Sequence, residues 1–317
     1  MMKIIPFILF SFLISSIAIS QNTDLDSVFL FYKQLNNTEQ RLLKFKDSDQ
    51  HLKFKTQQLE IINQSRAKHN VQLVKLDILA CRVANKMCQE AAKNKYVSHW
   101  NMKGEKPYHR WAIAGGYDHV SENAYGGLSI QKNEDKQQEI LNIMADGHKS
   151  FMSEIAPNDG HKRNCIDKDH NYVGIGFAIY DRHFRYYEEF IDRYYSFKNI
   201  PRKARPKQTI TISVKPQDGN YLYALAAFRG KKLKERNPLS LTLKGPYHDG
   251  SMQIGYSISA DEIEKYRKGD WYNLPIKFDK AGIYYIQIYQ SAKPHKSGIT
   301  STKGKLQASG IVIRVGM

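Results

Sequence analysis

The sequence predicts two domains, an α+β domain followed by an all-β domain. Its 317 residues are more than one average hydrophobic core accommodates, so two domains are the natural expectation. Helix-type and strand-type patterns follow one another over residues 58–197, whereas short strand-type runs recur over residues 208–317. A basic stretch that contains two prolines, residues 198–207, is expected to link the two domains.

Residues 1–20 have the parts of a cleavable secretory signal. Lys3 precedes an apolar run from Ile4 to Ile19, and small residues stand before Gln21. This run is shorter than the roughly 18 residues of a membrane-spanning helix, which favours a cleaved signal over an uncleaved anchor. No later segment is apolar for long enough to span a bilayer. We therefore expect a secreted or periplasmic protein whose mature form has no transmembrane segment.

Three helices are expected in the first domain, after a weakly helical, polar segment at residues 21–57. The first helix begins near Gln58, and the third runs from about residue 135 to residue 153. Residues 103–127, rich in glycine and aromatic side chains, are expected to form a structured loop region. Asp77 suits the first turn of the second helix. One face of that helix carries an apolar stripe of Leu76, Leu79, Val83, Met87 and Ala91.

Two strands are expected after the third helix. Val173, Ile175 and Phe177 alternate with glycine and alanine, so one face of the first strand is bulky and the other almost bare. A bare face allows a helix to approach closely. Residues 181–183 turn the chain into a second run, residues 184–191, which predicts an antiparallel hairpin. Helices combined with antiparallel strands indicate an α+β layered domain.

The second domain is predicted to be an independently folding β-sandwich. Short strand-type runs recur there, separated by glycine, proline, asparagine and aspartate. The expected strands are residues 209–214, 221–228, 239–243, 252–258, 271–278, 282–289 and 311–315.

Positive charge is concentrated in this second domain. The whole chain has a formal net charge of +17, and residues 205–317 hold 19 Lys and Arg against 8 Asp and Glu. A basic exported domain favours an anionic partner, such as a cell-envelope or glycan surface, and nucleic acid is not an expected partner outside the cell. The alternative is that the charge serves only solubility.

The three cysteines are expected to be buried free thiols. Cys81 and Cys88 are seven residues apart in one helix, which separates them by about 10.5 Å along the axis. This exceeds the roughly 7 Å limit between the Cα atoms of a disulfide, so they cannot pair with each other. Either could reach Cys165, but an odd number leaves at least one thiol unpaired, and the spacing gives no zinc-finger signal.

Six short motifs follow one another between Asn63 and Phe190: an opening made of Asn63–Arg66 and Lys95–His99, then Gly104–Arg110, Ala114–Tyr117, Ser121–Ala124, Gly160–Ile166 and Tyr186–Phe190. In this order they resemble the bacterial SCP-like branch of the CAP superfamily, the secretory, antigen-five and pathogenesis-related proteins. The resemblance covers residues 58–191.

The resemblance implies an α-β-α sandwich with a cleft lined by two histidines and two glutamates. His99, Glu122 and His161 carry over directly by motif. Glu154 matches the aromatic-x-x-Glu pattern that precedes the second histidine of the family. Asn123 and His109 are further candidates for the cleft. The chain departs from the family pattern in two places, because Ser121 replaces a glycine and the loop before His161 is short.

Two imidazoles and two carboxylates that meet in a cleft suit a divalent metal ion, with zinc the favoured ion. Alternatively, each carboxylate accepts a proton from one imidazole and fixes its tautomer, which gives two structural His–Glu pairs. His148 is expected at a solvent-facing or cleft edge and not as a ligand. Arg110 is expected to anchor a loop through backbone carbonyls or a carboxylate.

Three hypotheses for function follow. The favoured one is an exported binding module whose cleft takes a small amphipathic ligand, a lipid or an envelope component, while the β-sandwich adds surface attachment. The second is a hydrolase in which a metal-bound water attacks an ester or amide and a glutamate serves as base. The third is a purely structural brace. No G-x-S-x-G or H-E-x-x-H motif of a standard hydrolase is present.

Overall fold

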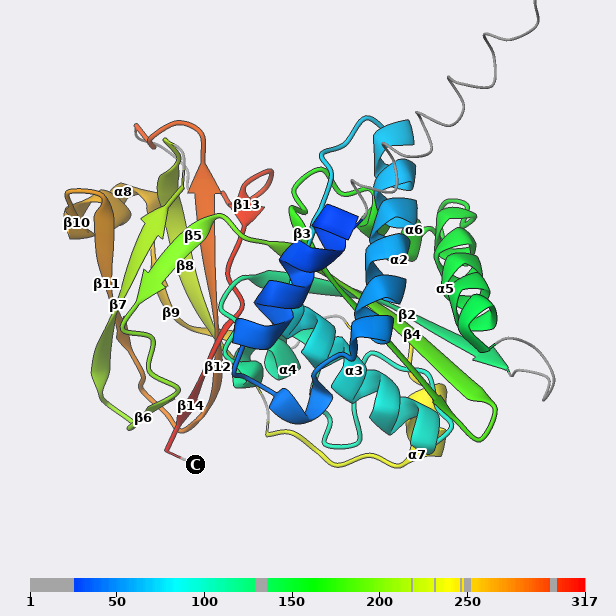
Figure 1. Cartoon of the computed structure of the whole chain (residues 1–317). Coiled ribbons are helices and arrows are strands. Elements are labelled where there is room, and N and C mark those ends of the chain that lie inside the picture. Colours follow the sequence, from blue (N-terminus) through cyan, green and yellow to red (C-terminus); the bar gives the residue numbers. More distant parts are fainter. Residues whose placement is uncertain are drawn as a thin grey trace, which may run out of the picture.

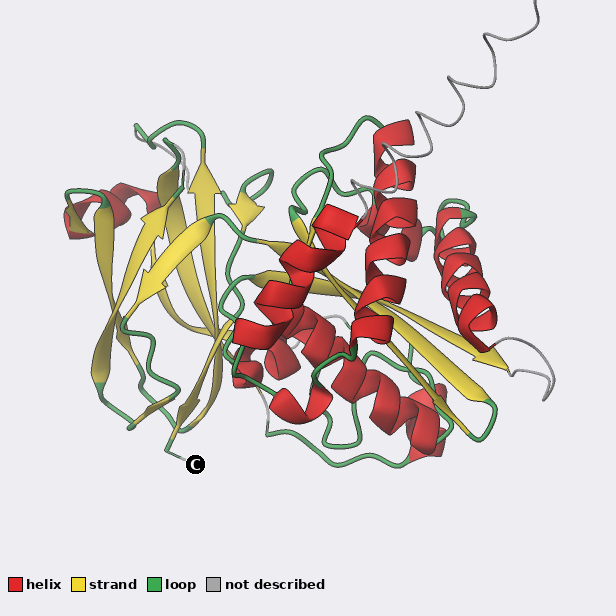
Figure 2. Ribbon diagram, viewed as in Figure 1, coloured by secondary structure: helices red, strands yellow, loops and turns green. Residues whose placement is uncertain are grey.

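The computed structural model describes residues 26–128, 136–217, 219–230, 232–245, 247, 252–296 and 301–316. The chain forms two lobes side by side, helices around a sheet in one and a β-sandwich in the other (Figure 1). This confirms the predicted fold class, an α+β domain followed by an all-β domain (Figure 2). The expected signal peptide, residues 1–20, lies outside the described residues.

The first lobe is built on a four-stranded sheet in the order β1-β3-β4-β2, in which only β1 and β3 run parallel among the paired strands. Its strands are β1 (Lys75–Leu76), β2 (His119–Leu128), β3 (Tyr172–Tyr180) and β4 (His183–Asp192). Residues 26–38 are helical, and the named helices are η1 (Leu43–Phe45), α2 (Asp49–Lys68), α3 (Ile78–Lys93), α4 (Pro107–Ala114), α5 (Lys136–Met152) and α6 (Gly160–Cys165).

Helices cover both faces of this sheet, which gives three layers. Apolar side chains of α3 and α4 share one cluster with Val120 and Ile191. Those of α2 and α5 share another with Val173 and Phe177 on the opposite face. The glycines of β3 explain the close fit of α3, because a Cβ on Gly174 would lie 2.3 Å from the Cβ of Ala80. The bare strand face predicted from the alternation is therefore confirmed.

Several local predictions in this lobe are wrong. Residues 103–127 are not a loop region, because they contain α4 and most of β2, whose pairing with β4 compensates for its weak local pattern. Leu76 lies in β1, and the second helix begins only after Asp77, whose side chain caps it by accepting from the Ala80 N–H. α2 begins at Asp49, so the first helix starts well before Gln58, where we expected it to begin. None of the described helices has the length and apolarity needed to cross a membrane.

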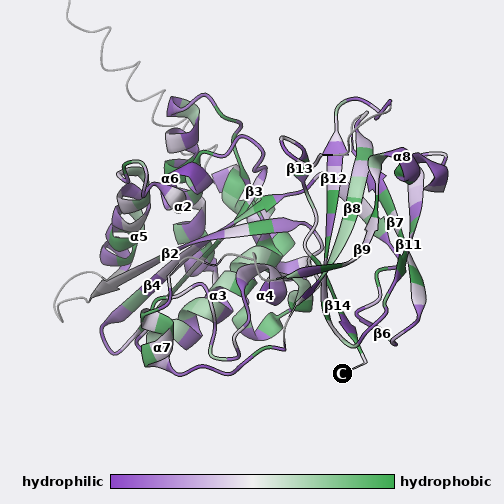
Figure 3. Cartoon of the chain, turned by 180° about the vertical axis from the view of Figure 1, so that it is seen from behind, coloured by the Kyte–Doolittle hydropathy of each residue, from purple (hydrophilic) through white to green (hydrophobic). Residues whose placement is uncertain are grey.

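The second lobe has two sheets, in the orders β10-β11-β7-β5 and β6-β14-β12-β8-β9, with β13 paired to β12. Alternate side chains of both sheets fill the core between them, among them Ile212, Leu274 and Ile286. In Figure 3, hydrophobic residues (green) lie along β8 and β12, and β12 also carries hydrophilic ones (purple). The elements are β5 (Tyr195–Lys198), β6 (Lys203–Ala204), β7 (Thr209–Pro216), β8 (Tyr221–Gly230), α7 (Pro238–Thr242), β9 (Gln253–Ile258), α8 (Ala260–Ile263), η2 (Glu264–Tyr266), β10 (Arg267–Lys268), β11 (Trp271–Lys277), β12 (Gly282–Ser291), β13 (Leu306–Gln307) and β14 (Ile311–Val315).

The strand expected at residues 239–243 is the short helix α7. Asn237 caps it by accepting from the Ser240 N–H, and Pro238 occupies its first turn, where a missing N–H has no cost. Leu241 is then buried against the first lobe and not in the sandwich. Capping and this tertiary contact override the apolar run that suggested a strand.

The stretch expected to be a linker, residues 198–207, contains the last residue of β5 and the whole of β6, and both strands belong to the sandwich. β5 pairs with β7, and β6 pairs with β14. Tyr117 packs edge-on against Phe197, and the Gly310 N–H donates to the Tyr117 carbonyl at 2.7 Å, so the two lobes are in direct contact. We propose that the boundary between the domains lies near residue 194, just after β4, and the ranges predicted above stay predictions.

Candidate functional site

Four predicted residues, His99, Glu122, Glu154 and His161, form what we call the two-histidine site. His99 follows α3, and Glu122 lies in β2. Glu154 follows α5, and His161 lies in α6. Segments far apart in sequence thus bring the four side chains to the same end of the sheet.

The site consists of two His–Glu pairs that face each other. His99 Nδ1 is 2.9 Å from Glu122 Oε1, and His161 Nδ1 is 2.5 Å from Glu154 Oε1. The ring centroids of His99 and His161 are 6.2 Å apart. Each glutamate therefore orients one imidazole, as the alternative with two His–Glu pairs predicts.

The pairing decides which histidine nitrogens remain available. An ionised carboxylate can only accept a hydrogen bond, so each Nδ1 must carry the hydrogen that it donates. A neutral imidazole has one N–H, so the Nε2 atom of each ring then keeps a lone pair. In metal sites a histidine commonly donates its other N–H to a carboxylate in this way. The His161 side chain is 34 % exposed and the His99 side chain 16 %, so solvent reaches the site mainly on the His161 side.

Glu122 belongs to a buried charge cluster with Arg110 and Glu189. Arg110 donates to Glu122 and, at 3.4 Å, to Glu189 Oε1. Burial and the Glu122 charge raise the pKa of Glu189 well above its usual range. One guanidinium thus faces two carboxyl groups, of which Glu189 retains its proton. Arg110 also donates to the carbonyls of His99 and Glu105, which confirms its predicted role as a loop anchor.

This cluster also affects His99. Burial, reinforced by the charge of Arg110, lowers the pKa of His99 to about 4. His99 is therefore neutral at physiological pH and can offer a lone pair to a metal ion or a ligand proton.

Strand register explains why a second polar network lies on the opposite face of the sheet. Glu122 stands opposite Glu189 in the β2–β4 pair, and the next residues, Asn123 and Glu188, stand opposite each other. Because successive side chains of a strand point to opposite faces, Glu189 joins the two-histidine site and Glu188 points away from it.

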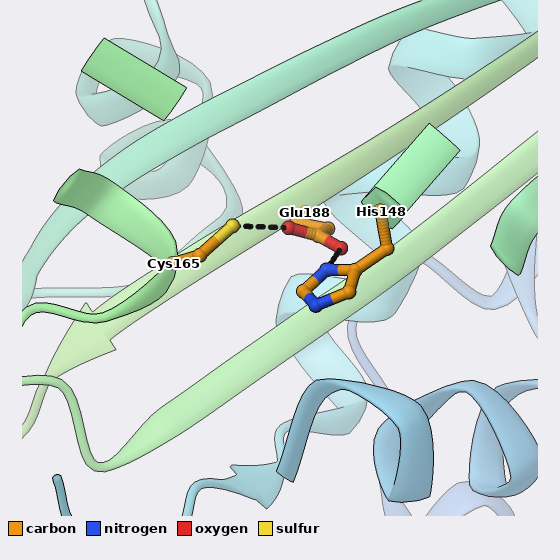
Figure 4. Close-up of side chains that lie close together, drawn as sticks. All are labelled: His148, Cys165 and Glu188. Carbon is orange, nitrogen blue, oxygen red and sulfur yellow. Dashed lines mark hydrogen bonds and ion pairs between the residues drawn. The ribbon is translucent and has the colours of Figure 1, made fainter. Parts of the chain in front are cut away.

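Glu188 contacts His148 and Cys165 (Figure 4). His148 Nδ1 is 2.8 Å from Glu188 Oε1, and Cys165 Sγ is 3.5 Å from Glu188 Oε2. All three side chains are buried, so the prediction that His148 lies at an exposed edge is wrong. Their donor atoms lie within 4.8 Å of one another, and the group could hold a metal ion.

In the described structure, hydrogen bonds already engage each of these donors. His148 Nε2 contacts Ser65 Oγ at 3.0 Å, and the Tyr186 hydroxyl donates to Glu188 at 2.6 Å. Burial raises the pKa of Cys165 well above its usual range, so the thiol keeps its proton. The network braces α5 and α6 against β4. All three cysteines are free and buried, as predicted.

The other two predicted cleft residues lie elsewhere. Asn123 is buried, and its amide donates to the His161 carbonyl, Cys165 Sγ and Glu188, so it fixes α6 on the sheet. His109 is fully buried at the contact between the lobes, with its ring edge-on to Tyr285 at 6.1 Å. Their assignment to a ligand cleft stays a prediction that neither contact supports.

Sequence reasoning missed Glu188, Glu189 and Tyr247. Two consecutive glutamates inside an apolar strand are a signal for buried carboxylates on both faces of a sheet. Tyr247 had no such signal. Its ring lies edge-on to His99 at 5.1 Å, although it comes from the second lobe.

Comparison with known proteins finds a family match over the part of the chain that contains this site. Residues 59–191 match the cysteine-rich secretory protein family, CAP. No curated protein matches the sequence. An outer surface protein of Borrelia burgdorferi is similar in structure at 16 % identity with a TM-score of 0.34, over 43 % of this chain and 90 % of that one.

A second similar structure is an extracellular protein containing an SCP domain from Bacillus anthracis, at 19 % identity with a TM-score of 0.33. The match covers 44 % of this chain and 43 % of the Bacillus chain. The family match and the layered architecture agree with the order of the six motifs. Residues 59–191 of this chain are thus a CAP domain, as the order of the six motifs predicted.

Proposed function

We propose that the CAP domain is a binding module that takes a small amphipathic ligand, a lipid or an envelope component at the two-histidine site. A divalent metal ion, with zinc favoured, would be held there by Nε2 of His99 and His161. The observation that carries this proposal is the 6.2 Å separation of two imidazoles whose Nδ1 atoms are both occupied by carboxylates. Bound there, the ion would attract a ligand oxygen.

The glutamates then act as orienting partners and not as direct ligands. Both oxygens of Glu122 are engaged, one by His99 and the other by Arg110. Glu154 Oε2 accepts the backbone N–H of His161 at 2.8 Å while Oε1 faces its ring. Replacing such a partner typically weakens metal affinity 10- to 100-fold without abolishing it.

The same contacts disfavour the hydrolase. A general base must accept a proton from the attacking water, and here that proton would compete with the donors that already engage the carboxylate oxygens. Neither glutamate of the site has an oxygen without a donor. The binding module is therefore the function that the geometry supports best.

Metal content tests this proposal directly. The mature protein is purified, loaded with Zn²⁺, freed of excess ion and analysed, beside H99A/H161A and a control, H69A, whose histidine is exposed. We expect about one zinc per chain in the wild type and in H69A, and none in the double variant. Equal zinc in all three proteins would place the ion elsewhere, and none in the wild type would favour the brace.

We further propose that the protein is secreted or periplasmic and that its basic second domain attaches it to an anionic surface. Residues 205–317 carry most of the excess positive charge. Screening beyond a Debye length of about 8–10 Å should release the protein from anionic vesicles as salt rises. Retention that does not change with salt would contradict electrostatic attachment.

A further inference from the structure

The connection between β8 and β9 leaves the sandwich and crosses onto the CAP domain. The Arg236 N–H donates to the Met102 carbonyl at 2.8 Å. Leu241 of α7 is fully buried in a cluster with Met87 and Trp100. Figure 1 shows α7 beside α3, far from the strands that precede and follow it. The second domain thus reaches the end of the CAP domain that carries His99.

Aromatic rings from both domains meet there. Tyr247 lies 5.1 Å from His99, 6.0 Å from Trp100 and 6.4 Å from Tyr108, measured between ring centroids. Burial and the charges of Glu122 and Glu189 raise the pKa of Tyr247. Tyr247 is therefore an aromatic wall of the two-histidine site, contributed by the second domain.

Two lysines border these rings, and Arg236 lies on the same connection between β8 and β9 as Lys244. Lys244 Nζ is 4.3 Å from the centroid of Trp100, and Lys106 Nζ is 5.5 Å from that of Tyr108. Burial and the charges of Arg236 and Lys106 lower the pKa of Lys244. Within the described residues, the buried Nε of Arg236 has no hydrogen-bond partner. The carboxylate of Glu105, next to Lys106, is engaged by the Asn101 amide at 2.7 Å.

A cavity of about 90 Å³ lies between the domains. It is lined by Tyr108, Tyr247 and Tyr285 together with polar side chains that include His119 and Gln287. At about 30 Å³ per water, it has room for roughly three waters or a small polar group.

We propose that the two domains together form a binding site for an anionic amphiphile. Its anionic group, a phosphate or carboxylate, contacts Lys106, Arg236 and Lys244, and its body lies on the rings of Trp100, Tyr108 and Tyr247 beside His99. Arg and Lys give strong charge-assisted hydrogen bonds to such oxygens, and the rings offer flat apolar surface. This deepens the proposed function, on which it rests for the position of the ligand.

The test uses the full chain and a small aromatic anion, phenyl phosphate, with neutral phenyl glucoside as the matched probe, in calorimetric titrations. We expect phenyl phosphate to bind and phenyl glucoside to bind at least tenfold more weakly. R236A/K244A should weaken phenyl phosphate binding at least tenfold, about 1.4 kcal/mol. K280A/K303A, which removes the same charge from exposed positions, should not. Equal losses in both double variants would reduce the effect to net charge and overturn the proposal.

Tyr247 gives a second, independent readout. Y247A should weaken phenyl phosphate binding, whereas Y247F, which keeps the ring and tests the fold, should retain most of it. Tighter binding by Y247A would mean that the ring blocks the site, and that outcome overturns the proposal.

Two further experiments identify the source of the anionic group and distinguish failure of this proposal from failure of the proposed function. Binding to vesicles with phosphatidic acid is compared with binding to phosphatidylcholine vesicles and to inorganic phosphate, which shows whether the site takes a lipid headgroup or a free phosphate. If the protein binds none of the anionic probes, the proposed site is refuted. H99A/H161A tests the proposed function alone. If it leaves phenyl phosphate binding intact while R236A/K244A weakens it, the anion site stands and the two-histidine site fails.

Discussion

His109 offers a quantitative test of the contact between the two domains. Its side chain is fully buried in α4 and faces Tyr285 of β12, and neither ring nitrogen has a hydrogen-bond partner among the described residues. Burial lowers its pKa to about 4. The unfolded chain, with a pKa of about 6.5, therefore binds more protons than the folded chain between pH 6.5 and 4. Stability must fall as pH falls through that window.

The magnitude follows from linkage. A difference of about 2.5 pKa units at 1.36 kcal/mol each gives a total loss of about 3 kcal/mol, of which about 2.5 kcal/mol is reached by pH 4.5. H109F removes this titration and also two unpartnered nitrogens, whose burial costs about 1–3 kcal/mol each. We expect H109F to be at least as stable as the wild type at pH 7 and to gain a further 2.5 kcal/mol over it, approximately, at pH 4.5.

Urea unfolding at both pH values, followed by tryptophan fluorescence, measures the difference. Trp111 lies in the same helix, so its emission reports on this region. His99 has a similarly lowered pKa, but its contribution is common to both proteins and cancels. H69Q serves as the exposed control. If wild type and H109F lose the same free energy between pH 7 and 4.5, His109 is not buried without partners and the reasoning is wrong.

Three other predictions concern packing and buried charge. G174A should destabilise the protein by about 3 kcal/mol, because the added Cβ would stand 2.3 Å from the Cβ of Ala80. G160A is the control, since nothing lies within 4 Å of its added Cβ, and it should change the midpoint of thermal unfolding little. Equal shifts of the midpoint in both variants would contradict the close approach of α3 to β3. E189Q should cost under about 1 kcal/mol of stability, because the raised pKa of Glu189 means that the group is already protonated. E188Q should cost about 3 kcal/mol, because the pKa of Glu188 is lowered by His148 and its charge is lost. Chemical denaturation compares the two variants, and the reverse order would refute these protonation states. The thiols of Cys81, Cys88 and Cys165 should resist a water-soluble disulfide reagent in the native protein and react on unfolding; fast reaction of any one would show that it is not buried.

Strong periodic patterns allowed correct predictions in this chain. The Val173–Ile179 alternation predicted a strand with a bare face, and α3 packs on that face. The motif order predicted which histidines and glutamates the fold would bring near one another. The first prediction rests on local alternation, which the sequence shows directly, and the second rests on the resemblance to the CAP superfamily.

Contacts between distant segments could not be predicted in this way. β2 is a strand because β4 pairs with it along its whole length, and α7 is a helix whose Leu241 is buried against the other domain. Tyr247 reaches His99 only because the β8–β9 connection crosses onto the CAP domain. No periodicity within 119–128 or 238–247 contains that information.

The central claim is that His99 and His161 hold their Nδ1 protons against glutamates and present Nε2 to one shared site. Nitrogen NMR of the imidazoles measures this most directly, in ¹⁵N-histidine-labelled protein titrated with Zn²⁺. We predict that both rings are Nδ1–H tautomers at pH 7 and that both Nε2 resonances shift together and saturate at one ion per chain. Nε2–H tautomers, or a zinc shift confined to His148, would contradict the account.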